Sequence, residues 1–292
     1  MEVVLCENAG FCFGVKRAVD TVYELCAHET GKSIYTYGPI VHNDRVVTEL
    51  AALGVTVIRD EGELRDLKER GALDNSCIVI RAHGISDPLM AEIESIPGVS
   101  VTDATCPYVR KIHEIVREHE RKGERIVVTG DPDHPEVKGI TGCLGKEALV
   151  IRTAEEARIL SLPEDTKICV VSQTTFHQQK FEDIVEILKK KLYDISVVNT
   201  ICNATQRRQS ETAEIARKCD AMIVIGSRSS SNTRKLFDIA ESECRATYFI
   251  QCLDDLKLLT IDNSVRCIGI TAGASTPKTI IEEVLNYVRT EF

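Results

Sequence analysis

The chain has 292 residues, of which 43% are hydrophobic and 28% charged, as is typical of a globular protein with a large buried core. Its net charge of −9 disfavours a nucleic-acid-binding surface, which would need a basic stripe. The opening MEVVLCENAG lacks the features of a signal peptide, and no stretch approaches the roughly 20 apolar residues of a membrane span. We therefore expect a cytoplasmic protein that binds neither nucleic acid nor membrane.

Along the chain, predicted strands and helices alternate in a pattern that occurs three times. Each repeat begins with a β-rich run that ends in a cysteine just before a polar helix start: Cys12, Cys106 and Cys202. A second strand ends in a glycine, a third leads into an acidic helix, and a fourth is rich in Val, Ile and Cys. The pattern predicts three tandem units with these boundaries: 1–104, 105–198 and 199–292.

Apolar strands that alternate with helices indicate an α/β fold, with mostly parallel sheets flanked by helices on both faces. Ligands of such sheets bind beyond the carboxyl ends of the strands. Packing of the three units about a pseudo-threefold axis would bring these edges to one centre. The sequence leaves open which sheet the strand before each cysteine joins, since it can pair with either neighbouring unit.

The twelve cysteines include no CxxC pair, which excludes the usual zinc-ribbon and thioredoxin-like patterns. Cys77, Cys169 and Cys267 hold equivalent places in the fourth strand of each repeat, where a free cysteine is most simply a small hydrophobe. Cys12, Cys106 and Cys202 instead precede helices, whose positive ends favour a thiolate. Three converging thiolates indicate a metal centre. The alternative is that they are inert relics of duplication.

The loops that follow other strands in each repeat carry polar side chains suited to an anion. They are His42, His83, His134, Thr174, Ser230, Ser231, Asn232 and Ser275. Hydroxyls, an amide and helix N–H groups facing one point form a plausible cradle for a diphosphate, although single loops of this kind are often plain turns. Glu136 lies two residues after His134 and suits proton donation. Its alternative role is that of an acid near a helix N-terminus.

The ordered motifs AGFCFGVKRA, HNDRVV, RAHGIS, DATCPYVRKIH, HPEVKG, SQTT, NTICNATQRRQ, GSRSSSN and TAGASTP resemble the IspH/LytB family. These are the 4-hydroxy-3-methylbut-2-enyl diphosphate reductases of the non-mevalonate isoprenoid pathway. The resemblance implies one 4Fe–4S cluster with an open fourth iron, at the centre of three α/β units. Its three ligands would be Cys12, Cys106 and Cys202.

The resemblance also implies roles for the polar loops. The diphosphate would be held by His42, His83, His134, Ser230, Ser231, Asn232 and Ser275. Glu136 would supply protons, Thr174 would orient that relay, and Thr205 would assist near the cluster. No GxGxxG fingerprint follows a strand, so electrons would come from a ferredoxin or flavodoxin.

Two other functions remain possible on the residues alone. One is a redox-neutral enzyme with a three-cysteine cluster, similar to quinolinate synthase. The other is a cluster-bearing redox sensor that is not an enzyme. Consumption of reducing equivalents would separate the reductase from the first, and tight binding of a diphosphate would separate it from the second.

Overall fold

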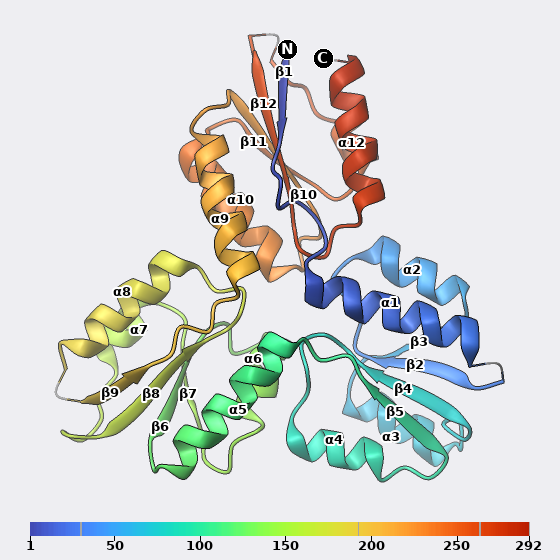
Figure 1. Ribbon diagram of the computed structural model, residues 1–292, viewed down its shortest axis with the longest axis vertical. Helices are drawn as coiled ribbons and strands as arrows, with labels where there is room; N and C mark the ends of the chain where they lie inside the picture. The colour runs from blue at the N-terminus through green and yellow to red at the C-terminus, as the bar shows by residue number, and fades with distance from the viewer. Residues whose placement is uncertain (30, 192, 263, 292) are drawn as a thin grey trace. The chain divides into compact units, whose positions relative to one another are not determined.

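The computed structural model describes residues 1–29, 31–191, 193–262 and 264–291. Strands and helices alternate from β1 to α12 and form three four-stranded sheets, in which neighbouring strands of the described residues pair in parallel (Figure 1). The predicted α/β class with parallel sheets and flanking helices is confirmed. Within the described ranges, none of the helices has the length and apolar character needed to cross a bilayer.

The first sheet has the strand order β3-β2-β4-β5. Its strands are β2 (Ser33–Tyr37), β3 (Thr56–Ile58), β4 (Ser76–Ile80) and β5 (Val99–Asp103). The helices that precede and connect them are α1 (Phe13–His28), α2 (Asp44–Ala52), α3 (Glu61–Glu69) and α4 (Asp87–Glu94).

The second sheet repeats this order as β7-β6-β8-β9. Its strands are β6 (Arg125–Thr129), β7 (Leu149–Ile151), β8 (Lys167–Ser172) and β9 (Asp194–Val197). Its helices are α5 (Pro107–Arg121), α6 (Pro135–Thr141), α7 (Ala154–Ile159) and α8 (Gln178–Lys189).

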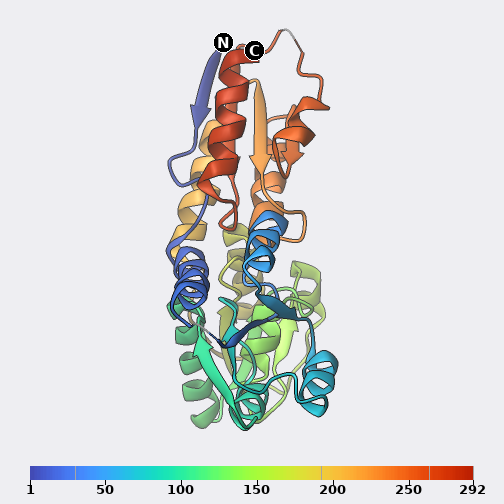
Figure 2. The same ribbon diagram turned by 90° about the vertical axis from the view of Figure 1, so that its right-hand side faces the viewer.

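The third sheet has the order β1-β12-β10-β11. Its strands are β1 (Glu2–Leu5), β10 (Ala221–Ile225), β11 (Thr247–Ile250) and β12 (Cys267–Ala272). Its helices are α9 (Asn203–Ala216), α10 (Ser231–Glu243), α11 (Leu253–Lys257) and α12 (Lys278–Glu291). Figure 2 shows β1 and α12 within this part of the chain.

The pairing of β1 answers the question that the sequence left open. β5 precedes Cys106 and pairs with β4 of the first sheet. β9 precedes Cys202 and pairs with β8 of the second sheet. β1 has no preceding sheet and pairs with β12 at the other end of the chain, with Leu5 opposite Ile270. Each of the three cysteines therefore follows an edge strand that completes a four-stranded sheet. For Cys12 that strand is β1, which completes the sheet formed by the last part of the chain. The unit boundaries given above stay a prediction.

The apolar strands are buried on both faces, as their continuous Val/Ile runs predict. In β6, Ile126 and Val128 belong to one apolar cluster and Val127 to another. Because neighbouring side chains of a strand point to opposite faces, the two clusters lie on opposite faces of the second sheet. This burial fixes the register and so fixes which residues end each strand at its carboxyl edge.

By its internal contacts the chain divides into two compact units. The one-sheet unit comprises residues 1–16, 41–48 and the chain from Cys202 onward, and it contains the third sheet. The two-sheet unit comprises residues 17–40 and 49–201, and it contains the first and second sheets. Each unit is described separately below.

Candidate active site

The predicted site residues all lie where the chain leaves the carboxyl end of a strand, but they are divided between the two compact units. The one-sheet unit carries Cys12, His42, Cys202, Thr205, Ser230, Ser231, Asn232 and Ser275. The two-sheet unit carries His83, Cys106, His134, Glu136 and Thr174. Within each unit the local structure can be built from the strand ends upward.

In the one-sheet unit, Cys12 and Cys202 are held by backbone hydrogen bonds at the starts of helices. The N–H of Cys12 donates to the carbonyl of Ala274 at 3.4 Å, which ties the β1–α1 loop to the loop after β12. Cys202 is the N-cap of α9 with φ −65° and ψ 135°. Burial raises the pKa of the Cys202 thiol, while the N–H groups of Ala204 and Thr205 lower it. The predicted help from the helix start is present, but desolvation outweighs it.

Arg208 is a buried cation beside these two cysteines that the sequence analysis did not single out. Its side chain is 5% exposed, and its Nη2 donates to the carbonyl of Gly10 at 2.6 Å. Its Nε atom has no hydrogen-bond partner. Burial lowers the pKa of the guanidinium, and negative charge on Cys12 or Cys202 opposes that effect. An anionic group bound to these thiols would compensate the buried charge.

The spacing of residues along α9 is the sequence signal that could have identified Arg208 as buried. The buried residues of α9 recur three and four positions apart and include Thr205, Arg208 and Thr212. Arg208 therefore lies on the inward face of a helix that begins at a candidate metal ligand. In the sequence it looks like one more surface charge within NATQRRQSET, where exposed arginines are the rule.

The loop between β10 and α10 forms a polar cradle in the same unit. The Oγ of Ser230 accepts a hydrogen bond from the N–H of Thr233 at 3.3 Å and so caps α10. The amide of Asn232 is 5% exposed, and neither its Oδ1 nor its Nδ2 has a hydrogen-bond partner. A buried side-chain amide normally makes hydrogen bonds, because leaving it unpaired costs about 1–3 kcal/mol. The amide of Asn232 is thus placed to bind a ligand.

Two glycines let the strand ends pack closely beneath this cradle. Gly226, which ends β10, has φ +147°, a conformation that side chains disfavour. A Cβ atom on Gly226 or Gly273 would run into the side chain of Thr233, which is fully buried. Replacement of either glycine would therefore displace the first turn of α10.

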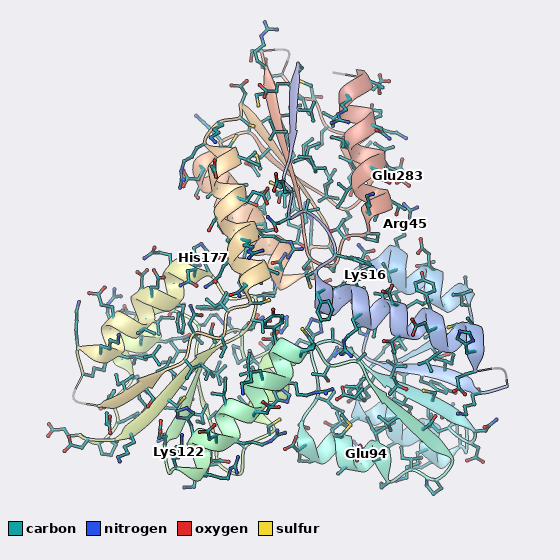
Figure 3. The ribbon with its side chains drawn as sticks, in the orientation of Figure 1. Lys16, Arg45, Glu94, Lys122, His177 and Glu283 are labelled. Carbon is teal, nitrogen blue, oxygen red and sulfur yellow. The ribbon has the colours of Figure 1, made fainter. Side chains whose placement is uncertain are left out.

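Ser275 connects the loop after β12 to the His42 segment. Its hydroxyl donates to the carbonyl of His42 at 3.0 Å, so the Ser275 side chain positions the loop before α2. Farther along, Arg45 of α2 forms an ion pair with Glu283 of α12 at 3.0 Å (Figure 3). That pair is largely exposed and adds little stability.

In the two-sheet unit, Glu136 and Thr174 form a buried, hydrogen-bonded pair. Glu136 is 1% exposed at the start of α6, and its Oε2 lies 2.7 Å from the hydroxyl of Thr174. Its Oε1 accepts from the N–H of Thr174 at 2.5 Å. His134, the N-cap of α6, accepts from the N–H of Glu136 through Nδ1 at 3.1 Å. In the neutral ring the proton then lies on Nε2, which makes that nitrogen a donor.

Cys106 and His83 lie on neighbouring loops of the same unit. Cys106 is the N-cap of α5, Pro107 occupies the first turn, and the N–H of Cys106 donates to the carbonyl of Ala82 at 3.0 Å. The ring of His83 lies edge-on to that of His134, with centroids 5.3 Å apart. The structure thus brings His83, His134, Glu136 and Thr174 together through contacts within the two-sheet unit.

These features define a class of protein: an α/β protein with three parallel sheets, in which cysteines and polar loops follow the strands at their carboxyl ends. The family model described as "LytB protein" matches residues 3–289 of the chain. The chain therefore belongs to the LytB protein family. The family consists of metalloenzymes, and the chain has cysteine and histidine side chains able to bind a metal.

Curated relatives resemble the chain over almost its whole length. The 4-hydroxy-3-methylbut-2-enyl diphosphate reductase of Thermoanaerobacter sp. (strain X514) is 43% identical over 289 residues, which cover 99% of this chain and 97% of the relative. The protein of the same name from Caldanaerobacter subterraneus subsp. tengcongensis is 44% identical with the same coverage. The family match over residues 3–289 spans every motif singled out above.

Two solved structures share the fold. One is described as (E)-4-hydroxy-3-methyl-but-2-enyl diphosphate reductase, the terminal enzyme of the non-mevalonate pathway; it is 35% identical, with a TM-score of 0.68 and coverage of 99% of both chains. The other is the E-1-hydroxy-2-methyl-but-2-enyl-4-diphosphate reductase from Plasmodium falciparum. It is 31% identical, with a TM-score of 0.87 and coverage of 99% of this chain and 87% of that chain.

Proposed function

We propose that this protein is a 4-hydroxy-3-methylbut-2-enyl diphosphate reductase. The reaction removes the allylic hydroxyl of the substrate as water, consumes two electrons and two protons, and gives isopentenyl diphosphate and dimethylallyl diphosphate. The names of the full-length relatives support this activity and favour it over the redox-neutral enzyme and the sensor that the residues alone left possible.

The observation that carries the proposal is the unpaired amide of Asn232. It lies in a capped Ser–Ser–Asn loop at the start of a helix, where backbone N–H groups and the helix dipole favour an anion. A diphosphate oxygen would accept from Nδ2 and recover the cost of burying the amide. We propose that the diphosphate is bound by His42, His83, His134, Ser230, Ser231, Asn232 and Ser275.

The cofactor that we propose is one 4Fe–4S cluster with three cysteine ligands and an open fourth iron. The ligands would be Cys12 and Cys202 of the one-sheet unit and Cys106 of the two-sheet unit. The donor set fits, because thiolates are the usual ligands of such clusters and Arg208 supplies a buried positive charge next to two of them. When bound, the cluster would supply Lewis-acid coordination of the hydroxyl and the electrons for its removal.

The protein's own part in the chemistry would be proton delivery and exclusion of water. The hydroxyl of Thr174 can accept a proton from Glu136 while it passes its own proton onward, because it lies 2.7 Å from Oε2. The N–H of Thr174 holds the other carboxylate oxygen and so fixes the orientation of the pair. Burial of both side chains keeps bulk water from competing with this route.

The electrons would come from a small carrier, because the sequence has no flavin or nicotinamide fingerprint. We propose a reduced ferredoxin or flavodoxin as that partner, and a cytoplasmic location for the enzyme. A purified system can test each carrier directly.

Anaerobic dye oxidation tests the function. The reconstituted protein is mixed with a reduced viologen, and oxidation is followed after addition of the hydroxymethylbutenyl diphosphate. We expect rapid oxidation by the wild type and loss of it in Cys106→Ser, which removes a cluster ligand. Glu114→Gln, which changes an exposed carboxylate of α5, serves as the control and should leave the rate unchanged. A loaded wild-type protein that does not oxidise the dye would contradict the proposal.

A further inference from the structure

A second set of metal-ligand side chains lies in the two-sheet unit, away from the candidate active site. Nδ1 of His119, a carboxylate oxygen of Glu124 and Sγ of Cys169 all lie within 4.8 Å of one another. His119 is in the last turn of α5, Glu124 directly precedes β6, and Cys169 lies in β8. The set therefore gathers near the amino ends of β6 and β8, at the opposite edge of the second sheet from Thr174.

The three side chains are largely withdrawn from water. His119 and Glu124 are 16% and 13% exposed, with Nδ1 and Oε2 2.9 Å apart, and Cys169 is fully buried. Within the described part of the chain, the Cys169 thiol makes no hydrogen bond. Burial, with a smaller contribution from the Glu124 carboxylate and against the opposing effect of Lys122, raises the pKa of this thiol to about 12.

The cation Lys122 acts on the Cys169 thiol but does not offset the effect of its burial. Lys122, which follows α5 and is labelled in Figure 3, has its ammonium 2.6 Å from Glu118. A divalent ion would interact favourably with the imidazole, the carboxylate and the thiolate at once, and binding would release the thiol proton.

We propose that His119, Glu124 and Cys169 form a zinc-binding site. Zinc accepts nitrogen, oxygen and sulfur donors together, whereas magnesium and calcium prefer oxygen alone. Three protein ligands leave a fourth tetrahedral position for water. A cavity of about 300 Å³, lined by Glu124 together with Glu120, Lys146 and Glu147, borders the site at Glu124. Zinc here would connect the end of α5 to the central strand β8.

The repeat provides an internal comparison for Cys169. Cys77 holds the equivalent place in β4, and its thiol contacts the hydroxyl of Thr102 at 3.5 Å. Cys267 holds it in β12, where its sulfur lies 3.0 Å from that of Cys219. Of these three equivalent cysteines, Cys169 is the one whose sulfur lies within 4.8 Å of both a histidine nitrogen and a carboxylate oxygen among the described residues. Cys77→Ala is therefore the matched control for the loss of a buried strand cysteine.

The experiment measures zinc and iron together in the anaerobically prepared holoenzyme after equilibration with zinc and removal of the excess. We expect about one zinc per chain in the wild type and a loss of at least about tenfold in zinc affinity in His119→Gln, Glu124→Gln and Cys169→Ala. Iron content should stay unchanged in all three. Cys77→Ala should keep its zinc, and so should Cys106→Ser, which removes a ligand of the proposed cluster.

These two controls separate the site from the alternatives. Zinc lost in Cys106→Ser but kept in His119→Gln would assign the metal to the cluster cysteines and overturn the proposal. Wild-type protein that retains no zinc, or iron in place of zinc, would overturn it as well. Absorption spectroscopy at the zinc edge gives a second readout: one sulfur neighbour at about 2.3 Å supports the site, and three sulfur neighbours contradict it.

Discussion

Asn232 and Glu136 are both buried polar side chains near helix starts, but their surroundings differ. The amide of Asn232, in the one-sheet unit, has no hydrogen-bond partner on either polar atom. The carboxylate of Glu136, in the two-sheet unit, has both oxygens hydrogen-bonded to Thr174. The unsatisfied amide is available to a ligand, whereas the hydrogen-bonded carboxylate is oriented in advance, as the proposed proton transfer requires. The difference suggests separate roles in binding and in chemistry.

The largest effect that this comparison predicts is on turnover in Glu136→Gln. The amide keeps the size of the side chain but cannot deliver a proton, so kcat should fall by about 10²- to 10⁴-fold. KM should change little, because Glu136 is not assigned to the diphosphate. The measurement is steady-state dye oxidation with iron content matched between proteins. A variant with nearly normal kcat would move proton delivery to another residue.

A smaller effect, on binding, is expected in Asn232→Ala. Loss of a hydrogen bond to a charged group costs about 1.5–3 kcal/mol, which corresponds to a rise in KM of roughly 10- to 100-fold. The free energy of unfolding of the substrate-free protein should not fall by more than about 1 kcal/mol, because the amide is unpaired.

Asn43→Ala is the control for the stability part of that prediction. Asn43 is also 5% exposed, but its Oδ1 accepts from the N–H of Val46 near the start of α2. Its loss should cost about 1 kcal/mol of unfolding free energy in urea. If Asn232→Ala instead destabilises the protein strongly and leaves KM unchanged, the amide has a structural role and the comparison fails.

Thr174→Val tests whether the hydrogen bond from Thr174 orients the carboxylate of Glu136. The substitution keeps the shape and the backbone N–H but removes the hydroxyl that donates to Oε2 of Glu136. We expect a loss of about 1–3 kcal/mol in unfolding free energy together with lower kcat. Thr174→Ser restores a hydroxyl and should recover much of both. Equal kcat in the valine and serine variants would remove Thr174 from the proton route.

The smallest effect is expected from substitution of Arg208, which is assigned neither to diphosphate binding nor to proton transfer. Arg208→Gln removes a positive charge near Cys12 and Cys202 and should shift the midpoint potential of the bound cluster to a more negative value. Arg208→Lys keeps the charge and should shift it less. A redox titration followed by electron paramagnetic resonance measures both. Identical potentials in the three proteins would limit Arg208 to holding the Gly10 carbonyl.

The repeat made much of the fold predictable. Continuous Val/Ile strands, each followed by a helix, predicted parallel sheets, and the cysteines and glycines marked strand ends that the structure confirms. The pairing of β1 was not predictable, because the residue pattern of a four-residue strand does not depend on which strand it pairs with. Its partner β12 lies more than 260 residues away, as the register of Glu2 with Cys267 shows. Only tertiary packing selects it.

The strand-end loops of the candidate site were predictable where their composition is distinctive, as in GSRSSSN. The site was not predictable where the role of a residue depends on neighbours from distant segments. Arg208 looks like a surface charge until α9 turns it inward toward Gly10. Cys169 looks like Cys77 until α5 and β6 bring His119 and Glu124 to it. The hydrogen bond from Ser275 to the His42 carbonyl likewise joins residues far apart in sequence.

The measurement that tests the central claim most directly is the electron and product balance of the anaerobic reaction. A limiting amount of 4-hydroxy-3-methylbut-2-enyl diphosphate is added to the holoenzyme with excess reduced viologen, a one-electron donor, and the products are separated and quantified. The account predicts two viologen molecules oxidised for each substrate consumed, with isopentenyl and dimethylallyl diphosphates together matching the substrate lost. Substrate consumed without dye oxidation, or dye oxidised without these two products, would contradict it.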